Sequence, residues 1–223
     1  MILPRGLVFL STLWMFASWI ICIGIRQPVQ PSIASYLPGI RLFFASIAVG
    51  LCVGWPMLRL SEPPTSAPIR QVIVDFIALM VLIHVVLWPL RLATNWTPSR
   101  MGLIDLSLFA WGSVIGAILA VTIASRSAFE RVTTMILILF IALMGPIAYF
   151  VCLRMNWATP AIWLDGPILG VLRESLKGGV SPDAPSWIVP LGIFLAGVVS
   201  WIMVALLYWI NSENVKKPSQ NLG

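Results

Sequence analysis

Residues 71–90 read QVIVDFIALMVLIHVVLWPL, and this stretch decides the class of fold. Its ionisable side chains are Asp75 and His84, and nearly all the other residues are apolar. About 20 consecutive apolar residues in a helix cross the roughly 30 Å hydrocarbon core of a bilayer. Residues 71–90 are therefore predicted to form a transmembrane helix.

The rest of the chain repeats this pattern, because its charged residues stand in short clusters between long apolar runs. Of the 223 residues, 59% are hydrophobic and 10% are charged, whereas a soluble domain has about 25% charged residues. The alternating segments of a membrane β-barrel are absent from the sequence. We predict an all-α, polytopic integral membrane protein whose residues 1–210 form a single transmembrane helical domain, followed by a polar tail at 211–223. About six spans are expected, near 6–25, 40–58, 71–90, 102–125, 132–153 and 188–210.

The connections between the predicted spans differ in character. Pro28, Pro31 and Pro38 predict an extended segment after the first span. The longest connection, residues 154–187, contains a predicted short helix near 167–177, because Pro167 suits a first turn and two glycines follow at 178 and 179. Its apolar and charged residues gather on opposite sides. This amphipathic helix is expected either to lie in the membrane interface or to pack on the bundle as a loop helix.

The orientation in the membrane is not decided by the basic residues. The first apolar run ends in IGIR without a small-residue cleavage site, so we expect it to remain as the first span. With the N-terminus inside, the 14 basic residues divide evenly between the two sides. We expect both termini to lie inside a cytoplasmic-type inner membrane, because the basic loops on that side are compact.

The net charge of +6 does not indicate a nucleic-acid-binding protein, since the basic residues form no continuous face. Cys22, Cys52 and Cys152 lie inside apolar runs without the spacing of metal ligands. A self-contained bis-histidine haem site is excluded because the chain has one histidine. We expect no metal, no cofactor and no nucleic-acid partner, and the lipid bilayer is the expected surrounding.

Small residues recur at every fourth position in three predicted spans. Such stripes let helix backbones approach closely in lipid, where the hydrophobic effect does not drive helices together. The stripes are expected to face protein, either within one chain or between chains. They comprise Ser46, Gly50 and Gly54; Gly112, Gly116, Ala120 and Ala124; and Gly192, Ala196 and Ser200.

Asp75 and His84 are the candidate functional polar residues. Asp75 stands five residues after Arg70 and is expected to pair toward the interface. His84 lies deeper, where its imidazole either bonds a neighbouring hydroxyl or carbonyl group or serves a proton path or ligand contact. Because the two side chains face roughly opposite sides of one helix, they are not expected to form a relay.

The remaining polar residues form no enzyme signature, since motifs for nucleophilic, metal or phosphate chemistry are absent from the sequence. Asp105, Glu130 and Asp165 are expected at helix ends or in loops, paired with arginines at the surface. Pro146, which follows a glycine, predicts a kink in the fifth span. The sequence favours a non-enzymatic protein, although catalysis by residues from different helices stays open.

Two short segments resemble each other: LRLATNWTP at 90–98 and LRMNWATP at 153–160. Either a duplicated helical hairpin or the ordinary recurrence of Arg and Trp at membrane interfaces explains the likeness.

The sequence favours a non-catalytic subunit or assembly partner of a larger membrane complex, in contact with other membrane proteins or with itself. The alternative is a permease-type transport component that moves a small solute or protons. A transporter needs a polar cavity at mid-depth, whereas a packing subunit needs a lateral surface complementary to another chain.

Overall fold

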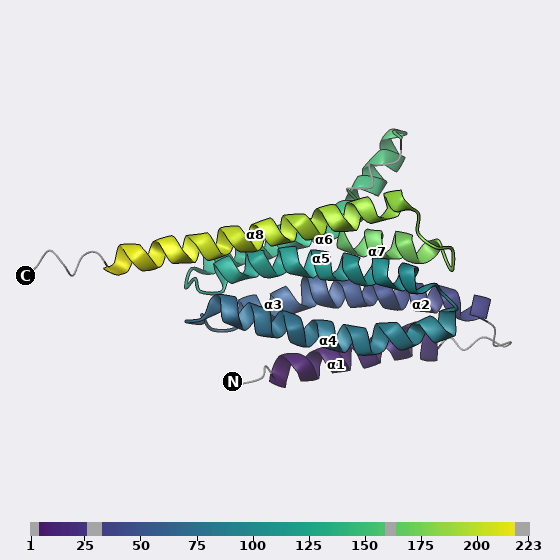
Figure 1. The fold of residues 1–223 in the computed structure, drawn as a ribbon, viewed down its shortest axis with the longest axis horizontal. Coiled ribbons are helices and arrows are strands. Elements are labelled where there is room, and N and C mark those ends of the chain that lie inside the picture. Colours follow the sequence, from purple (N-terminus) through teal and green to yellow (C-terminus); the bar gives the residue numbers. More distant parts are fainter. Residues whose placement is uncertain (1–4, 26–32, 159–163, 217–223) are drawn as a thin grey trace, which may run out of the picture.

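A computed structural model describes residues 5–25, 33–158 and 164–216 of the chain. The described residues form helices and no strand. In chain order the elements are α1 (Arg5–Trp19), η1 (Ile20–Gly24), α2 (Ile33–Val49), η2 (Gly50–Gly54), α3 (Trp55–Ser61), α4 (Pro68–Thr94), α5 (Pro98–Thr122), α6 (Ala128–Met155), α7 (Gly166–Leu176) and α8 (Ala184–Lys216). Figure 1 shows them as a bundle of long, roughly parallel rods.

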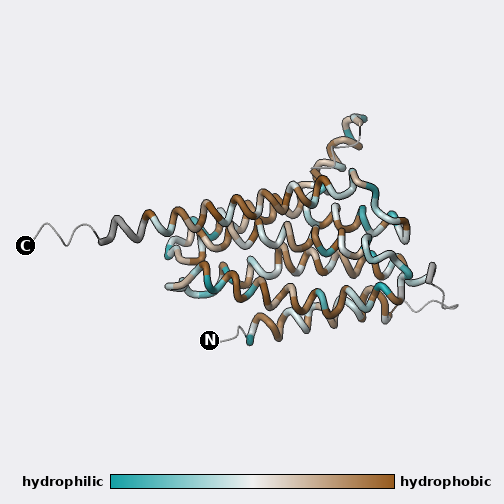
Figure 2. The backbone as a smooth tube through the Cα atoms, viewed as in Figure 1, coloured by the Kyte–Doolittle hydropathy of each residue, from teal (hydrophilic) through white to brown (hydrophobic). Residues whose placement is uncertain are grey.

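Six of these helical segments are long and apolar enough to cross a membrane, as the sequence predicts. They cover Arg5–Gly24, Ser35–Ser61, Pro68–Leu92, Pro98–Thr122, Ala128–Met155 and Ala184–Ile210. Hydrophobic residues cover the rods along their length, and hydrophilic residues gather toward the ends of the bundle (Figure 2). The chain is therefore a multi-pass α-helical membrane protein.

Two helices extend into segments that were expected outside the spans. Pro38 lies inside α2 instead of in an extended segment, and Pro28 and Pro31 lie outside the described residues. Pro38 stands only five residues after the start of α2, so the one backbone bond that it removes lies near the helix end. Close packing holds this end, because a Cβ on the neighbouring Gly39 would lie 2.4 Å from the carbonyl oxygen of Cys22. At the other terminus, α8 continues as a helix to Lys216, into the predicted tail.

Two spans contain a π-helical turn that the sequence analysis did not predict, η1 and η2. Gly50 begins η2 and packs against Trp14 of α1, where a Cβ would lie 2.7 Å from the indole nitrogen. The same indole donates a hydrogen bond of 3.1 Å to the carbonyl oxygen of Ser46, and the hydroxyls of Ser46 and Ser18 lie 2.6 Å apart. The Ser46 stripe thus packs against α1 at two of its positions, whereas Gly54 has open space where a side chain would project.

The stripe on α5 packs inside the bundle, because α5 is the most buried span. A Cβ on Gly112 would lie 2.6 Å from Phe76 of α4, and Gly116 lies against Trp201 of α8. Ala120 is fully buried, and its carbonyl oxygen accepts a 3.0 Å hydrogen bond from Tyr208. Ala124 differs from the expectation, since it follows the helix end and is exposed.

The stripe on α8 does not make the contact with α5. Ala196 is exposed, and Gly192 and Ser200 are half-buried. The residue of α8 that packs tightly is Gly197, where a Cβ would lie 2.9 Å from the hydroxyl of Ser113 on α5. Contact of the predicted stripe with another chain stays a prediction.

The short amphipathic helix is present as α7, and it packs on the bundle rather than lying apart from it. It contacts α2, α5 and α6, and it buries Val171 and Ser175 completely. Figure 1 shows α7 at the same end of the bundle as the start of α8. This contact agrees with a loop helix packed on the bundle, and a position of α7 in the membrane interface stays a prediction.

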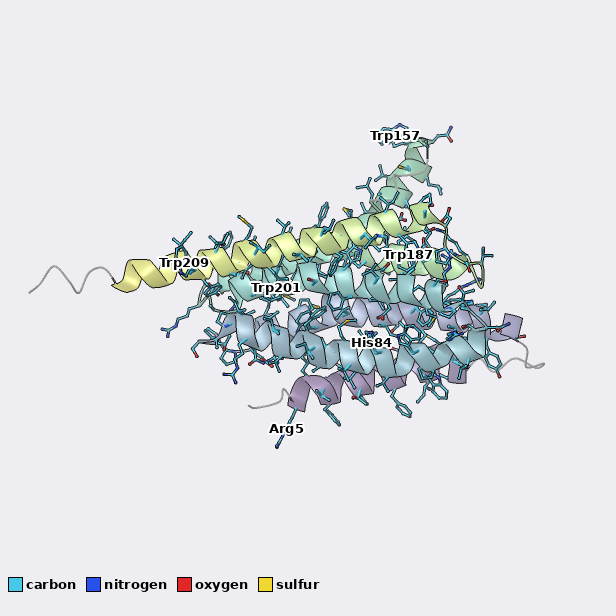
Figure 3. All side chains as sticks on the ribbon, viewed as in Figure 1. Arg5, His84, Trp157, Trp187, Trp201 and Trp209 are labelled. Atoms are coloured by element: carbon cyan, nitrogen blue, oxygen red, sulfur yellow. The ribbon has the colours of Figure 1, made fainter. Side chains whose placement is uncertain are left out.

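The N-terminus of α7 meets α6 beside the predicted kink. A Cβ on Gly145 would lie 1.9 Å from the carbonyl oxygen of Asp165, so only glycine permits this approach. Gly166 has φ +65°, a conformation that favours glycine. The helix continues through Pro146, and the C-terminal end of α6 leads away from the bundle, with Trp157 at its tip (Figures 1 and 3). Gly145 and Gly166 therefore allow the start of α7 to pack inside the bundle.

The two similar segments share a helix-ending structure. Asn95 ends α4 and Asn156 ends α6, both with left-handed backbone (φ 56° and 54°), and each caps its helix through its backbone N–H. Asparagine tolerates this conformation better than most residues. Their following tryptophans differ, since Trp96 is buried and Trp157 is exposed. The likeness thus corresponds to a common way of ending a helix.

Candidate functional site

The polar side chains of the bundle lie in three separate places, and the first contains Asp75. Its carboxylate is fully buried and pairs with Arg59 of α3, which donates from Nε to Oδ2 and from Nη2 to Oδ1 at 2.6 Å. Gln71 donates a further bond of 3.0 Å to Oδ1. The expected pairing toward the interface is present, but Arg59 rather than Arg70 is the partner.

Arg59 also pairs with Glu62, and Arg131 at the start of α6 donates to the backbone carbonyls of Leu60 and Glu62. The cluster therefore ties α3, α4 and α6 together at one end of the bundle. Both carboxylate oxygens of Asp75 accept hydrogen bonds, so neither oxygen is left unpaired.

His84 occupies the second place, on the outer face of α4 (Figure 3). Its Nδ1 lies 2.7 Å from the carbonyl oxygen of Met80, and its Nε2 lies 2.8 Å from Oδ2 of Asp105 on α5. The His84 side chain is 44% exposed. Asp105 was expected to pair with an arginine at the surface; instead it lies inside the span and pairs with this histidine. Asp75 and His84 thus have separate partners.

The third place is a cavity of about 180 Å³ at the opposite end from Asp75. We call it the α7 cavity, because residues of α7 line it together with α5, α8 and the connection between α7 and α8. Its lining includes Ser107, Trp111, Asp165, Arg173, Glu174, Lys177, Asp183 and Ser186. Trp111 stands 13 residues after the start of α5, roughly 20 Å along the helix, so the cavity extends from the bundle end toward its middle.

Asp165 is the most buried acidic side chain of the α7 cavity, with 4% of its surface exposed. Its Oδ2 accepts a hydrogen bond of 2.8 Å from Nη1 of Arg173, which stands eight residues later, in α7. Its Oδ1 is buried and has no hydrogen-bond partner among the described residues. Sequence reasoning expected Asp165 at the surface, which is wrong, because the close approach of Gly145 and Gly166 carries it into the bundle.

The basic side chains around the α7 cavity already have acceptors. Arg100 donates to Glu174 at 2.5 Å and to the carbonyl oxygen of Val180 at 2.8 Å. Lys177 donates to Glu174 at 2.7 Å. The hydrogen bond with Asp165, opposed by partial burial, raises the pKa of Arg173. These cations are therefore engaged with carboxylates or carbonyls of the protein.

Two hydroxyl groups that line the cavity also donate hydrogen bonds to acceptors of the protein. Ser107 donates to the carbonyl oxygen of Leu103 at 2.8 Å, and Ser186 donates to the Asp183 carboxylate. The bond from Ser186 lowers the pKa of Asp183, which is exposed at the cavity rim. A hydroxyl that has donated its proton retains lone pairs that accept.

The polar side chains of the spans do not all meet at one site. Ser113 packs against Gly197, and Thr122 bonds Thr134 at 3.0 Å. Neither these residues nor His84 lines the α7 cavity. Within the described residues, no three His, Cys, Asp or Glu side chains are grouped to hold a metal ion. Two sequence features lie beside the cavity, the Gly145-Pro146 pair and the DGP segment at 165–167. Their contact could not be predicted from the sequence, because it depends on α6 and α7 packing together.

The fold defines the protein as a multi-pass α-helical membrane protein with a polar cavity at one end of its bundle. Comparison with protein-family models, curated proteins and solved structures finds no match to the chain.

Proposed function

We propose that this protein is a non-catalytic subunit or assembly partner of a larger membrane complex. The observation that carries the proposal is the His84–Asp105 pair on the lateral surface. His84 stands ten residues before the end of α4, roughly 15 Å along the helix, and so lies within the span. Ionisable groups inside a membrane nearly always face protein or a water-filled cavity, because lipid does not solvate them.

The neighbouring surface supports a protein partner. Val81 and Val85, on either side of His84, are exposed and apolar. A partner helix that brings a hydrogen-bond donor or acceptor would cover the imidazole while its apolar side chains pack on these valines. The outward stripe around Ala196 on α8 supplies a second surface where a helix can approach closely.

Site-specific photocrosslinking in native membranes tests this proposal. A photoreactive residue in place of Val85 is expected to give a discrete protein adduct, and the same residue in place of Phe140 on α6 is the matched control. Both side chains are exposed and apolar, but only Val85 adjoins His84. Equal crosslinking to lipid alone from both positions would contradict the proposal.

The variant His84→Gln separates structural from functional roles for the imidazole. Glutamine retains hydrogen-bonding capacity but does not titrate near neutral pH. We expect the His84→Gln variant to assemble normally and to leave the host complex active, as measured by copurification and by the activity of that complex. Loss of activity with intact assembly would favour the second candidate.

The second candidate function is a permease-type transport component for a small solute or protons. The α7 cavity favours it, since broken or partial helices commonly surround membrane binding sites.

The start of α1 and the end of α8 lie at the same end of the bundle (Figure 1), as six crossings require. We further propose that this end faces the inner side of a cytoplasmic-type inner membrane.

A further inference from the structure

We infer that the α7 cavity binds a small organic cation with N–H donors, a primary ammonium compound, through Oδ1 of Asp165. This inference goes beyond the proposed function and does not depend on it, because a membrane subunit and a transporter can each hold such a ligand. The cavity is separate from the His84–Asp105 pair, so the two ideas are tested by different residues.

Asp165 supplies the buried carboxylate of the α7 cavity. Asp165 is 96% buried, since 4% of its side chain is exposed, and Oδ1 has no partner among the described residues. A buried polar atom without a hydrogen bond costs free energy, and a charged one costs more. Its counter-charge, Arg173, makes a single bond to the other oxygen and is 36% exposed. One oxygen therefore remains to accept a donor from a ligand.

No described side chain that lines the cavity donates a hydrogen bond to that oxygen. Arg100 and Lys177 bond Glu174, and the hydroxyls of Ser107 and Ser186 donate elsewhere. A ligand that fits must then bring its own donors and find acceptors. An ammonium group has three N–H donors and no acceptor, which matches the carboxylate of Asp165 and the lone pairs of Ser107.

Charge and aromatic surroundings favour a cation over a neutral donor. A hydrogen bond between an ammonium group and a carboxylate is roughly twice as strong as one between neutral groups. Trp111 lines the same cavity, and indole rings attract cations near their faces. An anion would meet the carboxylates of Asp165, Glu174 and Asp183, which line the same cavity.

The size of the cavity limits the ligand. An engineered protein cavity of about 150 Å³ takes up benzene, which has six heavy atoms. The α7 cavity, at about 180 Å³, therefore suits a compound of similar size. Its rim residues, Lys177 and Asp183, are exposed, so the cavity is reached from the polar end of the bundle.

The test measures binding of three probes to the full chain purified in detergent, by isothermal titration calorimetry at constant ionic strength. The probes are ethanolamine hydrochloride, tetramethylammonium chloride and glycerol. Ethanolamine is expected to bind at least about tenfold more tightly than either other probe, because tetramethylammonium lacks N–H donors and glycerol lacks charge. Absence of ethanolamine binding, or equal binding of glycerol, would overturn the inference.

Two matched variants locate the site. Asp165→Asn is expected to weaken ethanolamine binding at least about tenfold, whereas Glu130→Gln, the same loss of a carboxylate charge at an exposed residue outside the cavity, is expected to leave it within about twofold. Unchanged binding in Asp165→Asn would overturn the assignment. If that variant does not fold, Ser107→Ala serves in its place: a loss of about threefold or more is expected from removing an acceptor, and no loss would overturn the assignment.

Discussion

Asp75 and Asp165 are both buried carboxylates that pair with an arginine, yet they stand at opposite ends of the bundle in opposite states of hydrogen bonding. Both oxygens of Asp75 accept bonds from Arg59 and Gln71. Asp165 has one oxygen bonded to Arg173 and one without a partner among the described residues. Exposure alone does not distinguish the two carboxylates, whereas their hydrogen-bond partners do.

The two ends also differ in how they are built. Arg59 is 9% exposed and holds Asp75 and Glu62 together, which connects α3 with α4. Arg173 of α7 is 36% exposed and pairs with Asp165, the residue that immediately precedes the same helix. Both members of the Asp75 pair are buried, whereas the Asp165 pair joins a buried carboxylate to a partly exposed arginine, so removal of Arg59 is expected to cost more stability than removal of Arg173. We therefore assign a structural role to the Asp75 end and a binding role to the Asp165 end.

The largest expected effect comes from matched arginine substitutions at the two ends. Arg59→Leu leaves the Asp75 carboxylate buried without its counter-charge and is expected to lower the free energy of unfolding by about 3–5 kcal/mol. Arg173→Leu also leaves a buried carboxylate, Asp165, without its counter-charge, but the expected loss is smaller, about 1–2 kcal/mol, because Arg173 is partly exposed and gives Asp165 a single hydrogen bond. Reversible unfolding in mixed micelles measures both. Similar losses from the two variants would remove the distinction between the ends.

A smaller effect is expected from adding one methyl group at Gly145. Its Cβ would lie 1.9 Å from the carbonyl oxygen of Asp165, so Gly145→Ala must displace the start of α7. The expected loss in the free energy of unfolding is about 1–3 kcal/mol, with weaker ethanolamine binding because Asp165 moves. Gly54→Ala is the matched control, since no atom lies within 4 Å of its Cβ position. A Gly145→Ala variant with an unchanged free energy of unfolding would show that the position of α7 does not depend on this contact.

The spans could be predicted from the sequence because bilayer thickness sets their length. The run at 71–90 lies inside α4, and the predicted helix at 167–177 differs from α7 by one residue at each end. Proline and glycine mark these helix ends through local backbone preferences, which a sequence displays directly. Local rules were less reliable where packing opposed them, as at Pro38 inside α2.

The partners of the polar residues could not be predicted, since they depend on which helices lie side by side. Asp105 stands five residues after Arg100, which suggested an arginine partner, but Arg100 bonds Glu174 of α7 and Asp105 faces His84 of α4. Burial of Asp165 depends on Gly145, twenty residues earlier, meeting the start of α7. A single sequence carries no direct signal for such contacts between distant segments.

The most direct test compares Asp75→Asn with Asp165→Asn in two assays on the same purified protein, the free energy of unfolding and the affinity for ethanolamine. The predicted result is a reciprocal pattern. Asp75→Asn lowers the free energy of unfolding by about 3 kcal/mol or more and leaves ethanolamine affinity within about twofold, whereas Asp165→Asn changes stability by about 1 kcal/mol or less and weakens affinity at least about tenfold. Equal loss of stability from both variants, with ethanolamine affinity unchanged in Asp165→Asn, would contradict the account.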